Sequence, residues 1–159
     1  MLIAAVIIAA SVSSIAGDLV FDVCQGYYSG TKLPYRKAIS NGDGNGKYAL
    51  VIYLHGGSSK GNDNNKLAEK GIDSIANYIL RHNEKAVFVV PQCPSDKSWG
   101  GPMLSVLKGL IDDHMQAADM DHNRIYIFGG SMGGTGTWSM LSAYPGLFTS
   151  AMPVAGNPS

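Results

Sequence analysis

Gly129, Ser131 and Gly133 form a Gly-x-Ser-x-Gly sequence, the pattern in this chain that points most directly to chemistry. It directly follows the apolar residues 124–128, which are predicted as a strand, and directly precedes a segment predicted as a helix. In that setting the pattern predicts a nucleophile elbow, a sharp turn that presents the serine hydroxyl at the end of a sheet. Ser131 is therefore a candidate nucleophile.

A serine nucleophile needs partners. Its hydroxyl reacts only when a base takes the proton, and acyl transfer also needs N–H donors for the negatively charged oxygen of the intermediate. The backbone N–H of Met132, directly after the serine, is the first candidate donor. The alternative is a structural serine, because serine is a preferred residue at helix N-termini.

Strands and helices alternate along the chain. Apolar runs predict strands at residues 19–23, 33–39, 48–54, 86–90, 124–128 and 149–154. Apolar residues spaced by three and four predict helices over 64–82, over 102–118 and from the serine turn to about 143, with a loop at 119–123. This order predicts an α/β fold: a leading hairpin, then a mostly parallel sheet with helices on both faces. Ligands of such sheets bind at the carboxyl ends of the strands, where the serine turn and His55-Gly56-Gly57 both lie.

The composition excludes several classes of function. Lys plus Arg and Asp plus Glu number 12 each, so the charge balance does not indicate a nucleic-acid partner. The length of 159 residues is enough for one domain. We find no metal-ligand spacing and expect neither a metal nor a cofactor.

Residues 1–16 are apolar and end in Ser14-Ile15-Ala16, the small-x-small form of a signal-peptidase site. They predict a signal peptide, with the domain over 17–159, a secreted or periplasmic location, and no stable membrane association after cleavage. A buried first strand or helix is the alternative. In an oxidising compartment Cys24 and Cys93 can form a disulfide; they can equally be buried small apolar residues.

Five segments together resemble the secreted α/β-hydrolase esterases related to polyhydroxybutyrate depolymerases, feruloyl esterases and prolyl-oligopeptidase-like hydrolases. They are Leu54-His55-Gly56-Gly57, Gly61-Asn62-Asp63-Asn64, Pro91-Gln92-Cys93-Pro94, Asp121-His122-Asn123-Arg124-Ile125-Tyr126 and Gly130-Ser131-Met132-Gly133-Gly134. The resemblance implies an α/β-hydrolase fold and a serine esterase that works through an acyl-enzyme. It implies a small-molecule or polysaccharide-linked ester as substrate. A prolyl-oligopeptidase-like peptidase and a non-catalytic binding module are the alternatives.

The resemblance also suggests roles for single residues. Gly57 matches the position of the second oxyanion donor, with Ser58 as the alternative, and His55 matches a residue that shapes this loop. Trp99 is expected either to line the substrate pocket or to cover the core. Gly133, Gly134 and Gly136 are expected to allow close packing of the helix on the sheet.

The acid and the base of a triad are missing. In this family they follow the serine in the chain, yet no Asp, Glu or His occurs after Ser131. We therefore expect the chain to be the N-terminal part of a hydrolase, incomplete at the C-terminal side of the fold. On its own it is expected to be inactive.

Overall fold

A computed structural model describes residues 19–43, 46–67 and 69–158. The predicted signal peptide at 1–16 lies outside these residues. The strands are β1 (Asp22–Tyr28), β2 (Thr31–Ser40), β3 (Tyr48–Leu54), β4 (Ala86–Pro91), β5 (Met120–Gly130) and β6 (Ser150–Val154). The helices are the 3-10 turn η1 (Gly57–Ser59), α1 (Lys70–Arg81), α2 (Pro102–Met115) and α3 (Met132–Ala143).

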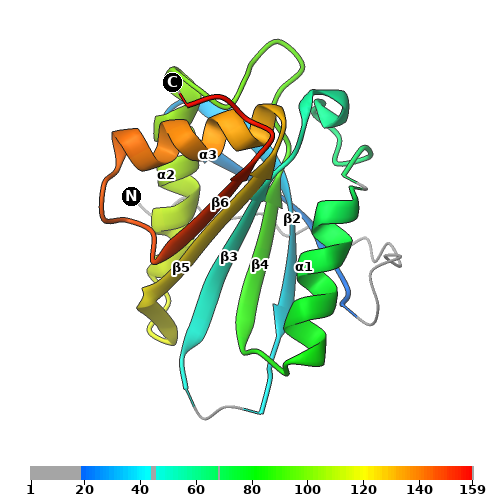
Figure 1. The fold of residues 1–159 in the computed structure, drawn as a ribbon, viewed down its shortest axis with the longest axis vertical. Helices are drawn as coiled ribbons and strands as arrows, with labels where there is room; N and C mark the ends of the chain where they lie inside the picture. Colours follow the sequence, from blue (N-terminus) through cyan, green and yellow to red (C-terminus); the bar gives the residue numbers. More distant parts are fainter. Residues whose placement is uncertain (1–18, 44–45, 68, 159) are drawn as a thin grey trace.

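The strands form one sheet in the order β1-β2-β4-β3-β5-β6 (Figure 1). β1 and β2 make the predicted antiparallel hairpin, and β2 pairs antiparallel with β4. β4, β3, β5 and β6 run parallel to one another. The predicted mostly parallel α/β sheet is confirmed.

Helices cover both faces of this sheet (Figure 1). Side chains of a strand alternate between the two faces, and β3 shows this clearly. Its Leu50 and Ile52 join the core under α2 and α3. Its Ala49 and Val51 join the second core, under α1. β3 is thus buried on both sides, as its continuous apolar run predicts.

Three predicted boundaries were wrong. The first strand covers Asp22–Tyr28 rather than 19–23. The first long helix begins at Lys70 rather than at residue 64, because the backbone N–H groups of Asp63 and Asn64 donate to the Gln92 side chain at 3.0 and 2.7 Å. The predicted loop 119–123 is mostly strand, since β5 already begins at Met120, which pairs with Tyr48.

The glycines after Ser131 let α3 pack against the sheet, as predicted. A Cβ atom on Gly133 would overlap the carbonyl oxygen of Leu54 at the end of β3. On Gly134 it would overlap the carbonyl oxygen of Val154, and on Gly136 the Cβ atom of Trp99. These are mostly backbone atoms, which cannot turn away as a flexible side chain can.

Gly133→Ala is therefore expected to lower the free energy of unfolding by about 3 kcal/mol, the upper part of the usual range for overpacking. Chemical denaturation followed by circular dichroism measures the change. Gly100→Ala is the control, because a Cβ atom there meets nothing within 4 Å. It should alter stability by no more than about 0.5 kcal/mol. Equal denaturation midpoints for the two variants would contradict this packing.

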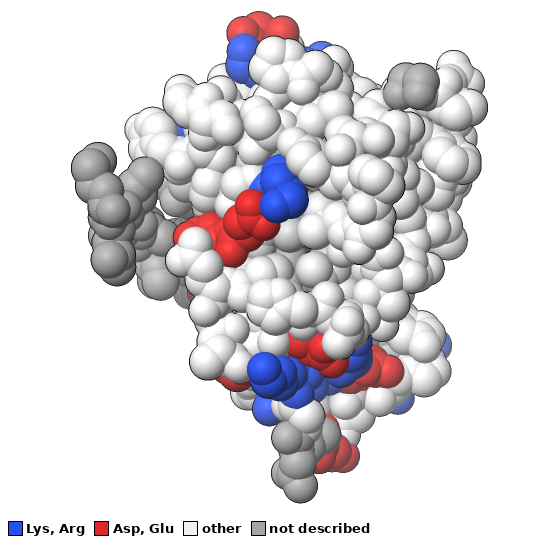
Figure 2. Space-filling view, turned by 90° about the vertical axis from the view of Figure 1, so that its left-hand side faces the viewer, with Lys and Arg blue, Asp and Glu red and all other residues white. Residues whose placement is uncertain are grey.

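Charged residues are absent from the C-terminal part of the sequence, from Ile125 to Ser159. Figure 2 views the molecule from the side of α2 and α3, and much of this face carries no charge. β6 is the last strand of the sheet, with Met152 and Val154 exposed. No helix in the described residues is long and apolar enough to span a membrane.

Candidate active site

Ser131 stands alone between β5, which ends at Gly130, and α3, which starts at Met132. Its backbone has φ 54° and ψ −117°, a conformation that costs energy for a residue with a side chain. The turn is held by the Ser131 N–H, which donates to the Val154 carbonyl at 2.9 Å. The residue is exposed, so a strained turn presents it to solvent.

The interpretation of Ser131 as a helix-capping serine is wrong. Its side chain makes no capping hydrogen bond to α3. Among the described residues, its hydroxyl has no hydrogen-bond partner. The oxygen is therefore free to meet a substrate or a base.

The loop after β3 lies beside Ser131. Leu54 pairs with Gly129, so β3 and β5 end at the same level of the sheet. A Cβ atom on Gly56 would lie 3.7 Å from the Cβ atom of Ser131. The next residue, Gly57, is exposed and opens η1.

Two backbone N–H groups near Ser131 are available as donors. Gly57 and Met132 are each the first residue of a helical segment, where an N–H has no partner within the helix. Within the described residues neither N–H donates to another acceptor. The structure thus brings the two predicted donors to one edge of the sheet, together with the serine.

His55 holds the β3 loop to the neighbouring loop. The ring is fully buried, and its Nε2 accepts the Cys93 N–H at 2.9 Å. Nδ1 therefore carries the proton and donates to the Gly56 carbonyl at 2.6 Å. Burial lowers the pKa of His55, which favours this neutral form. With both nitrogens occupied, His55 shapes the loop and is not placed as a base.

Trp99 takes the second of its two predicted placements, in the core. The side chain is 2% exposed, and its Nε1 donates to the His55 carbonyl at 3.0 Å. It therefore covers the core. It also borders a cavity of about 520 Å³ that Met132, Leu104 and Thr135 help to line. Whether this cavity receives substrate stays a prediction.

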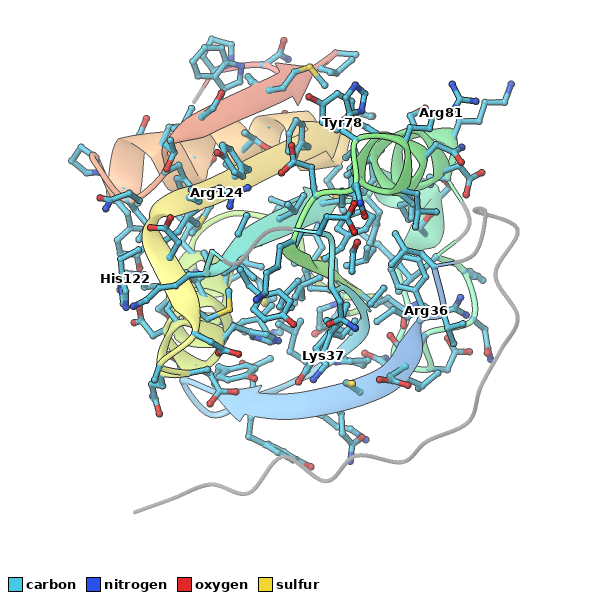
Figure 3. All side chains as sticks on the ribbon, turned by 90° about the horizontal axis from the view of Figure 1, so that it is seen from below. Arg36, Lys37, Tyr78, Arg81, His122 and Arg124 are labelled. Carbon is cyan, nitrogen blue, oxygen red and sulfur yellow. The ribbon has the colours of Figure 1, made fainter. Side chains whose placement is uncertain are left out.

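The other histidines lie far from Ser131. His122 is near the start of β5, at the opposite end of the strand; Figure 3 shows it there with Arg124. At about 3.3 Å per residue, most of the length of β5 separates it from the serine turn. His82 and His114 are at the C-terminal ends of α1 and α2. The described chain therefore places no histidine as a base for Ser131.

The cysteines are free and both are buried, so the second interpretation of this pair is correct. Among the described residues no group of three His, Cys, Asp or Glu side chains could hold a metal. One residue near Ser131 escaped the sequence analysis. Glu69 accepts the Gly56 N–H at 3.0 Å, and no local pattern marked it.

The chain is similar to proteins among the solved structures. No protein-family model and no curated protein matches the chain. A thermostable esterase is 32% identical, with a TM-score of 0.75 over 91% of this chain and 43% of its own length. The chain has the α/β-hydrolase fold. It resembles the esterase group of that fold, as its motifs predict.

More distant structures share this α/β-hydrolase fold. The feruloyl esterase module from Clostridium thermocellum is 16% identical, with a TM-score of 0.67 over 89% of this chain and 55% of its own. The acylaminoacyl peptidase from Pyrococcus horikoshii is 16% identical, with a TM-score of 0.60 over 84% of this chain and 23% of its own. This α/β-hydrolase chain thus spans from about a quarter to just over half of these proteins.

Proposed function

We propose that this chain carries the nucleophile and the oxyanion hole of a serine hydrolase that cleaves carboxylic esters. The observation that carries the proposal is Ser131, exposed at φ 54° between β5 and α3. The N–H groups of Gly57 and Met132 lie on the same edge, and no described residue accepts them, which supports the proposal.

In the proposed reaction Ser131 Oγ attacks the carbonyl carbon of the ester while a base takes its proton. The carbonyl oxygen becomes negative, and the N–H groups of Met132 and Gly57 bind it. The intermediate collapses, the alcohol leaves with the proton from the base, and an acyl-serine remains. Water, activated by the same base, then attacks the acyl-serine and releases the acid.

The base is the component that the described chain does not place beside Ser131. The proposal therefore assigns the base and its acid partner to the full-length gene product. For the same reason we expect residues 1–159 alone to be inactive.

The test is labelling of the full-length gene product with a fluorophosphonate probe, which reacts with activated serines. We expect one labelled residue, and peptide mass spectrometry should identify it as Ser131. Heat-denatured protein is the control and should not be labelled. Absence of the label from Ser131 would remove the hydrolase and favour a non-catalytic binding module.

The resemblance to an acylaminoacyl peptidase keeps a peptidase as the second candidate. A panel of small esters, feruloylated and acetylated sugars, and short peptides separates the two. Ester hydrolysis without peptide cleavage is the result that we expect.

We also propose that residues 1–16 are a signal peptide and that the protein is secreted or periplasmic. The apolar segment that ends in Ser14-Ile15-Ala16 supports this.

A further inference from the structure

Glu69 makes contacts that its position in the sequence does not explain. It directly precedes α1, yet its side chain makes no capping hydrogen bond to that helix. Instead the carboxylate turns toward β3 and the loop after it. Oε1 accepts the Gly56 N–H at 3.0 Å and the Ser59 hydroxyl at 2.6 Å. Oε2 accepts the Tyr53 hydroxyl at 3.1 Å.

This carboxylate lies close to the serine turn. A Cβ atom on Gly56 would lie 3.6 Å from Glu69 Oε1 and 3.7 Å from the Cβ atom of Ser131. On the other side, the Tyr53 hydroxyl would lie 3.3 Å from a Cβ atom on Gly130. Glu69 therefore links the start of α1 to the end of β3 and its loop, the part of the chain that lies against Gly130 and Ser131.

The three donors stabilise the charge of the Glu69 carboxylate, which takes part in no ion pair among the described residues. Hydrogen bonds to a charged acceptor are stronger than those between neutral groups. Burial and the charge of Glu69 raise the pKa of Tyr53 to about 12, so at neutral pH this hydroxyl stays a donor. The three hydrogen bonds to Glu69 therefore persist at neutral pH and hold the loop.

We propose that Glu69 is a positioning residue that holds the β3 loop so that the Gly57 N–H faces the reacting carbonyl oxygen. By accepting the Gly56 N–H it fixes the peptide group directly before that of Gly57. The Ser59 bond fixes the other side of Gly57. Gly57 itself is exposed, and no described residue accepts its N–H. This proposal rests on the proposed hydrolase function.

The test compares Glu69→Ala with Glu69→Gln in the full-length gene product. Alanine removes the acceptor, whereas glutamine keeps one oxygen for Gly56 and Ser59. For Glu69→Ala we expect kcat for ester hydrolysis to fall about 30-fold or more, with KM changed less than about threefold. Glu69→Gln should restore kcat to within about threefold of the unmodified protein.

Hydrogen exchange gives a readout that does not depend on activity. The amides of Gly56 and Ser59, which are hydrogen-bonded to Glu69 and to the Gly56 carbonyl, should exchange at least about tenfold faster in Glu69→Ala and at an unchanged rate in Glu69→Gln. Asp112→Asn is the matched control, because this carboxylate is exposed on α2 and pairs with Lys108 at 2.7 Å. It should leave both exchange and kcat unchanged.

The outcomes separate this proposal from the proposed function. Unchanged exchange of the Gly56 and Ser59 amides in Glu69→Ala overturns the positioning role whatever the activity. An equal loss of kcat in both Glu69 variants also overturns it, because the acceptor oxygen would then not matter. If the unmodified protein is not labelled at Ser131, the hydrolase function fails. Faster exchange would in that case show a loop contact without a catalytic role, which overturns the inference as stated.

Discussion

Replacing Ser131 by alanine should lower the rate of ester hydrolysis by the full-length gene product by about three orders of magnitude or more. The change removes the oxygen that forms the acyl-enzyme, and the remaining N–H donors and binding contacts cannot replace it. The fold should be retained, because Ser131 is exposed and its hydroxyl bonds to no described residue. Initial rates with a chromogenic ester measure the loss, and the thermal midpoint checks the fold.

Ser105→Ala is the control for this experiment. Ser105 is an exposed serine on α2, and its hydroxyl donates to the Pro102 carbonyl within the same helix. We expect its hydrolysis rate to remain within about twofold of the unmodified protein. A Ser131→Ala variant that kept more than a tenth of the activity would show that another group is the nucleophile.

Gly57→Pro should lower kcat by about 10²–10³-fold while the protein stays folded. Proline has no backbone N–H, so the substitution deletes the proposed second oxyanion donor and leaves Ser131 in place. The backbone conformation before residue 57 is compatible with proline. Gly56 has φ −74° and ψ 175°, the extended conformation that a residue before proline prefers. A Cβ atom on Gly57 meets nothing within 4 Å, and its N–H holds no hydrogen bond in the described fold.

Gly57→Ala is the matched control, since alanine keeps the N–H and adds only a methyl group in open space. Its kcat should stay within about threefold of the unmodified protein, and the thermal midpoints of both variants should stay close to it. An undiminished kcat in folded Gly57→Pro would reject Gly57 as a donor. The N–H of Ser58, the alternative from sequence, would then be the next to remove.

The two oxyanion donors differ in how far sequence alone could predict them. Met132 follows directly from its place after the serine, because the first N–H groups of any helix lack partners. Gly57 was reached only through resemblance to a family, and its availability depends on tertiary contacts. The Gly56 N–H is taken by Glu69, 13 residues along the chain, whereas the Gly57 N–H is left open.

The placement of Trp99 and the start of α1 also could not be predicted from sequence alone. No local pattern distinguishes a tryptophan in the core from one at a pocket. Trp99 packs in the core under α2 and α3, where the His55 carbonyl, 44 residues away, accepts its N–H. Helical spacing of apolar residues extends back toward residue 64. The helix does not begin there, because the N–H groups of Asp63 and Asn64 donate to the Gln92 side chain, 29 and 28 residues away in the chain. The spacing of apolar residues predicts which face of a helix is apolar, but not where the helix begins.

The sequence by itself determined the alternation of strands and helices, the mostly parallel sheet and the place of Ser131 between a strand and a helix. These follow from periods of 2 and about 3.6 residues and from glycine spacing, which are local properties. Only the tertiary structure decided that His55 has both nitrogens occupied, that the cysteines are free, and that Glu69 holds the loop beside Ser131. Such contacts depend on which strands become neighbours in the sheet, because that order brings together side chains that are distant in the chain.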